Sequence, residues 1–285
     1  MTSDPNVALT PLWGRRAFYK LPFTVVSDLY KARHLLALLV KRDLTSRYRR
    51  AYLGYGWAVL EPLLLAGVYT FLFTILIGTT DQLYPVKIII GIIGWQLFSR
   101  SLTNSTRSIS SSINLFQFAR IPKSVFATST MLTNFVLALV SLTCLIPFFF
   151  IHNLVVGIHL IFIPFWLFLL SLIGWGIGLM LAPIACKVPD IINLVNFLVR
   201  AGFFLSPVMW TYDMFEKRFG TGWEGWIAHL NPTIVPLTEM RNAVVGEPVI
   251  MQNYGYAIFV VICLASYILG SIIFELYAHK AVVNV

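Results

Sequence analysis

Six apolar segments run through this 285-residue chain, and each is long enough to cross a lipid bilayer as a helix. A crossing takes about 20 predominantly apolar residues, because a helix rises about 1.5 Å per residue through a hydrocarbon core about 30 Å thick. The six segments are Gly56–Gly78, Val86–Ile109, Val125–Ile151, Leu160–Ala185, Ile191–Tyr212 and Tyr254–Tyr277. Within lipid each segment must satisfy its own backbone hydrogen bonds. We therefore expect an all-α, polytopic membrane protein with six transmembrane helices.

The composition supports this class and excludes others. Hydrophobic residues make up 58% of the chain and charged residues only 12%, about half the charged share of an average soluble domain. The net charge of +9 does not indicate a nucleic-acid binder, because such a surface places its cations among polar residues rather than beside apolar runs. The cysteines Cys144, Cys186 and Cys263 are far apart, so we expect no metal site from them.

The cations predict the orientation of the chain in the membrane. Ten of the 21 Lys and Arg residues precede the first apolar segment, and few fall on the opposite side of the bilayer. The positive-inside rule then places both termini in the cytoplasm of a bacterial or archaeal cell, with the chain as a multi-pass plasma-membrane protein. The N-terminal residues lack the short apolar core of a cleaved signal peptide, so we expect the first apolar segment to direct insertion.

The chain divides into three parts. Residues 1–34 are expected to form an irregular cytoplasmic arm containing Pro5, Pro11 and Pro22. Residues 35–55 predict an amphipathic helix at the membrane interface, because every fourth residue from Leu36 to Tyr52 is apolar or aromatic and cations lie on the other face. Residues 56–280 hold the six-span domain.

Several charged residues lie within or at the ends of the apolar segments. Arg100 and Arg107 are seven residues apart on one face of the second segment, with Asn104 between them. An arginine facing lipid at mid-depth costs at least about 2.5–3.5 kcal/mol, so these residues should face protein, water or an anionic ligand. Arg107 could instead be a cytoplasmic loop charge. Arg200 is equally compatible with a structural ion pair, and Glu61 with an interfacial helix cap.

Two connecting segments are also unusual. On the cytoplasmic side, a short amphipathic stretch with exposed aromatic residues indicates a protein-docking surface, and its residues are Asn114, Phe116, Gln117, Phe118 and Arg120. On the outer side, Ser206, Pro207 and Trp210 end the fifth segment. A short re-entrant or gate helix is then expected, capped by Asn231, begun by Pro232 and ended by Gly246. Its apolar face would contain Ile234, Leu237, Met240 and Val244, with Arg241 on another face.

Taken in order, these pieces resemble the ABC-2 type permeases that export lipid-linked polysaccharides such as O-antigen and wall teichoic acid. The matching stretches are RDLTSRYRRAYLGYGWAVLEPL, IIGWQLFSRSLTNSTRSISSSINLFQFARIPKSVF, SPVMW and HLNPTIVPLTEMRNAVVG. The resemblance covers about residues 35–280. One departure is Val188-Pro189-Asp190, where the family usually places an arginine ahead of the aspartate and this chain has Lys187.

The resemblance implies a homodimer with a central path for a polyprenyl-diphosphate-linked glycan, and two copies of a separate ATPase subunit that binds ATP and Mg. The chain itself needs no cofactor, and it has no GxxxxGK[ST] phosphate loop. By resemblance, three groups of residues carry the function. Those of the substrate path are Arg100, Arg107, Asn104, Arg200 and Glu61; those of the ATPase contact are Arg42, Asn114, Phe116, Gln117, Phe118, Arg120 and Asp190; those of the outer gate are Ser206, Pro207, Trp210, Asn231, Pro232 and Arg241.

Two other function classes stay open. A drug or small-lipid exporter of the same ABC-2 architecture would share the six-span pattern. A membrane-embedded glycan-lipid enzyme would need clustered carboxylates or a metal site, whereas the 12 acidic residues here are isolated. The basic interface helix and the polar second segment favour the polymer exporter, because a diphosphate needs cations and a sugar chain needs hydroxyl and aromatic partners.

Overall fold

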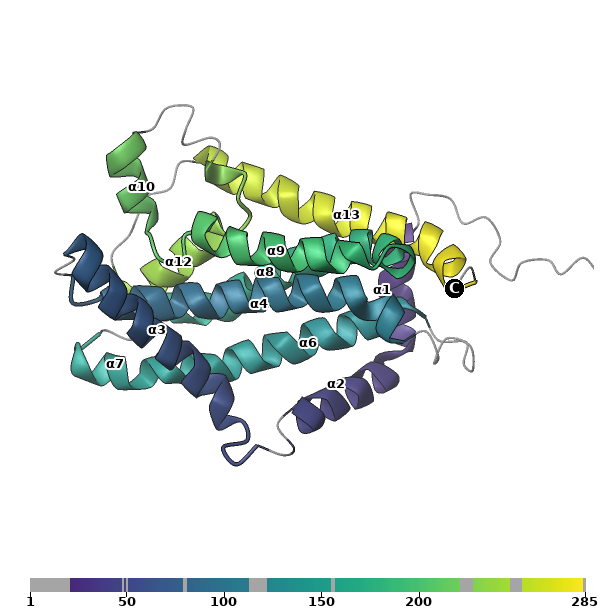
Figure 1. Cartoon of the computed structure of the whole chain (residues 1–285), viewed down its shortest axis with the longest axis horizontal. Coiled ribbons are helices and arrows are strands. Elements are labelled where there is room, and N and C mark those ends of the chain that lie inside the picture. The colour runs from purple at the N-terminus through teal and green to yellow at the C-terminus, as the bar shows by residue number, and fades with distance from the viewer. Residues whose placement is uncertain are drawn as a thin grey trace, which may run out of the picture.

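The structure is a computed structural model that describes residues 21–47, 49, 51–78, 81–112, 122–154, 157–220, 228–246 and 253–283. Every regular element in these ranges is a helix (Figure 1), which confirms the all-α fold class. The elements are α1 (Leu21–Lys31), α2 (Arg33–Arg47), α3 (Gly56–Ile77), α4 (Tyr84–Ser111), α6 (Ser124–Ser141), the 3₁₀ turn η2 (Leu142–Leu145), α7 (Ile146–Ile151), the 3₁₀ turn η3 (Ile158–Phe162), α8 (Ile163–Lys187), α9 (Asp190–Leu205), α10 (Tyr212–Phe219), α12 (Ile234–Val245) and α13 (Asn253–Val283).

Helices α4 and α8 pack along each other at the centre of a bundle (Figure 1). Helices α3, α6 and α9 pack against α4, and α13 packs against α8. Two glycines allow the central pair to approach closely. A Cβ added at Gly174 would lie 2.6 Å from the carbonyl oxygen of Phe98, and one at Gly178 would lie 2.5 Å from Cβ of Ser105. Small residues at this spacing bring helix backbones together in membranes.

Four stretches of the described helices are long and apolar enough to cross a membrane, and they are Gly56–Ile75, Ser124–Ile151, Ile158–Lys187 and Tyr254–Ala278. They match the predicted first, third, fourth and sixth spans. Helix α4 has 28 residues but is polar in its second half, and α9 has only 16 residues. These two helices coincide with the predicted second and fifth spans without reaching that length or apolarity, so the six-span arrangement stays a prediction.

The N-terminal region differs from its prediction in two ways. An irregular arm was expected over residues 1–34, but Leu21–Lys31 form α1. This helix is fixed by burial of Val25 and by a 2.9 Å hydrogen bond from the Tyr267 hydroxyl of α13 to the carbonyl of Pro22. The helix expected over residues 35–55 is shorter, because α2 ends at Arg47. Residues 52–55 are turns, and the left-handed φ of 49° at Gly54 is incompatible with a continuous helix.

Between α9 and α13, in the segment predicted to lie outside, the described residues include the short helices α10 and α12. The predicted apolar face of α12 is confirmed, since Ile234, Leu237, Met240 and Val244 are all buried. Gly246 ends the helix with a φ of 76° as expected. The start differs slightly: α12 begins at Ile234 rather than at Pro232, because the Asn231 side chain accepts hydrogen bonds from the backbone and hydroxyl of Thr233 and closes a turn there.

Candidate functional site

The polar residues of α4 divide into two sets on opposite faces. Ser101, Ser105 and Thr106 are buried, and the first two pack on the glycines of α8. The other set is at least partly exposed and recurs at helical spacing, forming a stripe along the second half of α4; its members are Gln96, Ser99, Arg100, Thr103, Asn104, Arg107, Ser110 and Ser111. We call this set the polar stripe. Only the polar stripe is available to a ligand, whereas the buried hydroxyls serve helix packing.

Glu61 of α3 pairs with Arg100 of α4 across the edge of the polar stripe. The Arg100 Nη2 atom lies 2.7 and 2.9 Å from the two carboxylate oxygens, and the Gln96 amide donates to Oε1 of Glu61 at 3.1 Å. The side chains keep exposed fractions of 30% for Arg100 and 42% for Glu61. Glu61 lies inside α3 with Pro62 after it, so it is a partner of Arg100 rather than the expected helix cap. The pair offsets the charge of Arg100 but leaves it accessible from one side.

Arg107 and Arg200, the other two arginines predicted for the substrate path, take no part in this ion pair. Arg107 is exposed on the polar stripe, seven residues from Arg100, which corresponds to about 10 Å along the helix. Arg200 is exposed on α9. Among the described residues neither arginine makes an ion pair. The structure thus brings Arg100, Asn104 and Arg107 onto one face of α4 and pairs Glu61 with Arg100, while Arg200 lies on the neighbouring helix α9.

Residues 206–210, which the sequence predicts to lie outside, form an irregular turn between α9 and α10 that we call the outer turn. Three side chains from other elements bind it, two through its backbone carbonyls and one through the Ser206 hydroxyl. Arg241 donates from Nη2 to the carbonyl of Val208 at 2.8 Å and from Nη1 to that of Trp210 at 3.1 Å. The Tyr84 hydroxyl donates to the carbonyl of Met209 at 2.9 Å. The Asn231 amide donates to the Ser206 hydroxyl at 3.0 Å. Four of the six predicted gate residues thus belong to one network.

Arg241 is the buried centre of this network, with 5% of its surface exposed. Its third bond runs from Nε to the carbonyl of Lys87 at 2.9 Å, which joins the outer turn to the start of α4. Burial lowers the pKa of Arg241 to about 10, so the guanidinium remains charged at neutral pH. A charge buried at this depth is tolerated because carbonyl oxygens surround it. Arg241 therefore joins α12 to the outer turn and to the start of α4.

The comparison with known proteins gives the family. Residues 34–245 match the family model described as ABC-2 type transporter. The chain belongs to the ABC-2 type transporter family. It is 29% identical over 217 residues to the O-antigen export system permease protein RfbA of Myxococcus xanthus, covering 76% of this chain and 82% of that protein. It is also 25% identical over 223 residues to RfbA of Klebsiella pneumoniae, with 78% and 83% coverage.

A third relative is the polysialic acid transport protein KpsM of Escherichia coli, which is 24% identical over 187 residues and covers 64% of this chain and 71% of that protein. The resemblance drawn from the sequence motifs is therefore confirmed at the level of the family. This ABC-2 chain is a multi-pass membrane protein, since the family match coincides with helices that are apolar and long enough to cross a bilayer.

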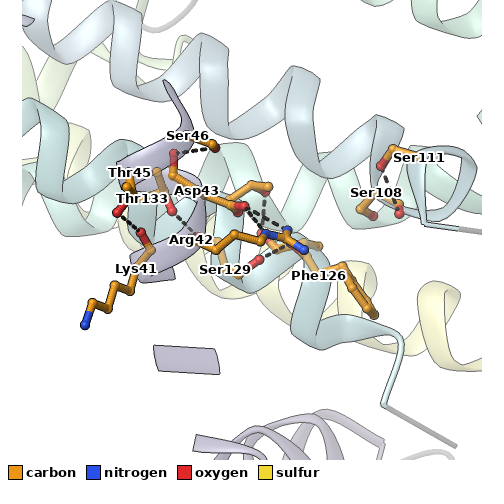
Figure 2. Close-up of polar contacts among 12 residues, drawn as sticks. Lys41, Arg42, Asp43, Thr45, Ser46, Ser108, Ser111, Phe126, Ser129 and Thr133 are labelled. Carbon is orange, nitrogen blue, oxygen red and sulfur yellow. Dashed lines mark hydrogen bonds and ion pairs between the residues drawn. The ribbon is translucent and has the colours of Figure 1, made fainter. Parts of the chain in front are cut away.

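The residues predicted for the ATPase contact are only partly described. Asn114, Phe116, Gln117, Phe118 and Arg120 lie outside the described residues. Arg42 is exposed and forms an ion pair with its neighbour Asp43 at 2.8 Å (Figure 2). Asp190 is exposed in the first turn of α9, where the helix dipole favours a carboxylate. The structure does not bring these two residues into contact with each other.

Sequence reasoning missed two residues of the outer network. Tyr84 precedes the predicted second segment and was not singled out, yet its hydroxyl donates to the carbonyl of Met209 in the outer turn. His229 is 1% exposed, and its Nε2 atom lies 3.2 Å from the hydroxyl of Tyr212. Burial lowers the pKa of His229 below its ordinary value. Neither residue has a spacing that marks it, because its partners are 125 and 17 residues away along the chain.

Proposed function

We propose that this chain is the permease subunit of an ATP-driven exporter that moves a polyprenyl-diphosphate-linked polysaccharide out across the plasma membrane. The polar stripe of α4 is the observation that carries this proposal. A diphosphate needs accessible cations, and Arg107 and the paired Arg100 supply two on one face. A glycan needs hydroxyl and amide partners, and Thr103, Asn104 and Ser110 of the same stripe supply them. The relatives named for O-antigen export and polysialic acid transport support this substrate class.

The path requires a second copy of the chain in this proposal. The polar stripe is flanked by α3 and α9, which both pack on α4 and touch each other through the rings of Tyr69 and Phe203. Both flanking helices expose large apolar side chains, including Phe71 at 69% and Phe197 at 65%. Two such surfaces placed face to face would enclose two polar stripes in one channel. A homodimer with six spans per chain and cytoplasmic termini fits this arrangement.

The energy comes from a separate ATPase subunit in this proposal, with two copies per dimer. The contact would involve Arg42 of α2, Asp190 of α9 and the segment from Asn114 to Arg120. ATP-driven closure of the two ATPase subunits would then move α2 and α9 relative to the bundle and open the path along the polar stripe. ATP and Mg belong to the partner subunit.

Export of the glycan in cells tests this function. Arg107→Ala is expected to reduce export on the order of tenfold or more, because a hydrogen bond to a charged group contributes about 1.5–3 kcal/mol. Arg107→Lys should be intermediate, since lysine keeps the charge but loses the planar fork that matches phosphate oxygens. Arg218→Ala is the matched control, because Arg218 is exposed on α10 and lies away from the stripe in the sequence.

Surface glycan is measured by immunoblotting at equal abundance of each variant in the membrane. Normal export by Arg107→Ala and by the double variant Arg100→Ala/Glu61→Ala would refute the proposal that the polar stripe carries the lipid-linked head group. The double variant removes both members of the ion pair, so that neither is left with an unpaired charge.

A further inference from the structure

An open groove lies between α2, α6 and the turn before α3. Its volume is about 620 Å³, within the range of roughly 300–1,000 Å³ that is typical of small-molecule sites. Most of its lining is apolar and comes from both helices and the turn before α3; these residues are Leu36, Ala37, Val40, Leu44, Tyr55, Leu132, Phe135 and Val136. The predicted apolar face of α2 therefore points toward this groove, in which a hydrophobic occupant is favoured over water.

Helix α2 is attached to α6 at its middle and at its end. At its middle, Leu39 is buried against Val125 and Phe126 of α6. At its last residue, Arg47 donates from Nη1 to the side-chain oxygen of Asn134 at 3.0 Å. The lining residues of α2 run from Arg33 to Thr45 on both sides of Leu39 in the sequence, so the groove runs beside these two contacts. Because the two contacts hold α2 against α6, the groove is a defined feature of the packed structure.

The surroundings of the groove are strongly basic. Arg33, Lys41 and Thr45 complete its lining. The described parts of residues 28–49 contain six Lys and Arg residues but only two acidic residues, Asp28 and Asp43. Asp43 is paired with Arg42, whereas the Lys41 side chain extends away from the other labelled residues (Figure 2). Lys41 makes no ion pair among the described residues. An occupant of this groove should therefore combine an apolar chain with a negatively charged head.

We propose that the groove binds an anionic phospholipid of the cytoplasmic leaflet, with one acyl chain between α2 and α6 and the phosphate beside Lys41. An acyl chain fills an open, elongated apolar groove, and Lys and Arg attract anionic headgroups near a membrane surface. The bound lipid completes the contact between α2 and the bundle. It is a separate site from the polar stripe, and its test does not depend on which substrate the chain exports.

Lipid retention on the purified full-length chain tests the site. The protein in detergent is titrated with phosphatidylglycerol or with zwitterionic phosphatidylcholine, and bound lipids are counted by native mass spectrometry. We expect phosphatidylglycerol to bind more tightly. Lys41→Gln should weaken its binding about fivefold, the ratio expected from the loss of one surface cation. Arg42→Gln, which makes the same charge change at the adjacent but paired residue, should alter it less than about twofold.

A second pair of variants tests the groove itself. Ala37→Trp places a large side chain in the lining and should abolish binding of both lipids, whereas Leu38→Trp, at a position 64% exposed and outside the lining, should leave binding unchanged. Val136→Trp repeats the test from α6 if Ala37→Trp does not fold. Equal effects of Lys41→Gln and Arg42→Gln would overturn the proposal, because they indicate surface charge without a site. Binding of added polyprenyl phosphate that phosphatidylglycerol cannot displace would also overturn it.

Discussion

Replacing Arg241 by methionine should destabilise the end of the bundle that contains the outer turn more than replacing an exposed arginine such as Arg200. Methionine fills a similar volume but donates no hydrogen bond. The carbonyls of Lys87, Val208 and Trp210 would each lose a donor. A buried acceptor left without its donor costs about 1–3 kcal/mol, and removal of the buried charge returns part of its desolvation penalty. Taking about 1 kcal/mol for each of the three carbonyls, the lower end of this range, the total loss of stability is about 3 kcal/mol.

This loss corresponds to a measurable change in thermal stability. For chains of this size, 1 kcal/mol shifts the midpoint by roughly 2 °C or more, so Arg241→Met should lower it by about 6 °C or more. The fraction of protein remaining monodisperse in detergent is measured by size-exclusion chromatography after heating. The midpoint of Arg241→Lys should fall between those of the wild type and Arg241→Met, because one ammonium cannot align with three carbonyls as the guanidinium does. Tyr84→Phe removes a single bond and should cost about 1 kcal/mol.

The matched control is Arg200→Met, since Arg200 is exposed on α9 and an exposed substitution usually stays within about 0.5 kcal/mol. Gly91→Ala gives an independent check, because an added Cβ would lie 2.8 Å from Nη2 of Arg241 and 2.8 Å from the carbonyl of Val208. If Gly91→Ala and Arg241→Met disturb the same hydrogen bonds, the double variant should be destabilised by less than the sum of the two single effects. Equal midpoints for Arg241→Met and Arg200→Met would refute the reasoning.

Two further predictions concern packing and pH. Gly178→Ala should lower the thermal midpoint by overpacking the contact between α4 and α8, whereas Gly67→Ala, where nothing lies within 4 Å of an added Cβ, should not; equal midpoints for the two would argue against the close approach. His229 should make stability pH-dependent: burial lowers its folded-state pKa, so the unfolded state binds the proton more readily and stability should fall as pH drops below about 6.5. His229→Gln should flatten this part of the curve and the exposed His159→Gln should not; a slope that persists in His229→Gln would assign it to another group.

The helices could largely be predicted from the chain because the responsible forces are local. Apolar length identifies Gly56–Ile75 and Tyr254–Ala278 as spans whatever they touch. The face of α12 followed from helical periodicity, and its end from a glycine that accepts a left-handed backbone. The local pattern failed over residues 51–55, where apolar periodicity continues past Arg47 but the backbone turns at Gly54. A periodic pattern does not exclude a turn when a glycine is present.

From the sequence, the candidate site could be recognised only as a set of charged residues whose exposure to lipid would be energetically unfavourable. Arg100 and Arg107 stood out because a cation in an apolar segment needs a partner, but which partner was decided by the tertiary structure. Glu61 is 39 residues from Arg100 along the chain, and the two meet because α3 packs on α4. The hydroxyls of α4 looked alike in the sequence. Helix packing buries Ser101 and Ser105 on the glycines of α8 and leaves Thr103 and Asn104 accessible.

Arg241 shows most clearly the difference between what can be predicted from the sequence and what depends on the folded chain. The sequence predicts a short helix that contains an arginine, and an arginine on an amphipathic helix is expected on the polar face because burying a charge is costly. Only the folded chain provides three backbone carbonyls, two from the outer turn and one from the start of α4, that offset this cost. Hydrogen bonds to backbone atoms leave no trace in side-chain identity. The sequence therefore determined the helices and the charges they carry, while contacts between distant segments decided which charges are buried, paired or accessible.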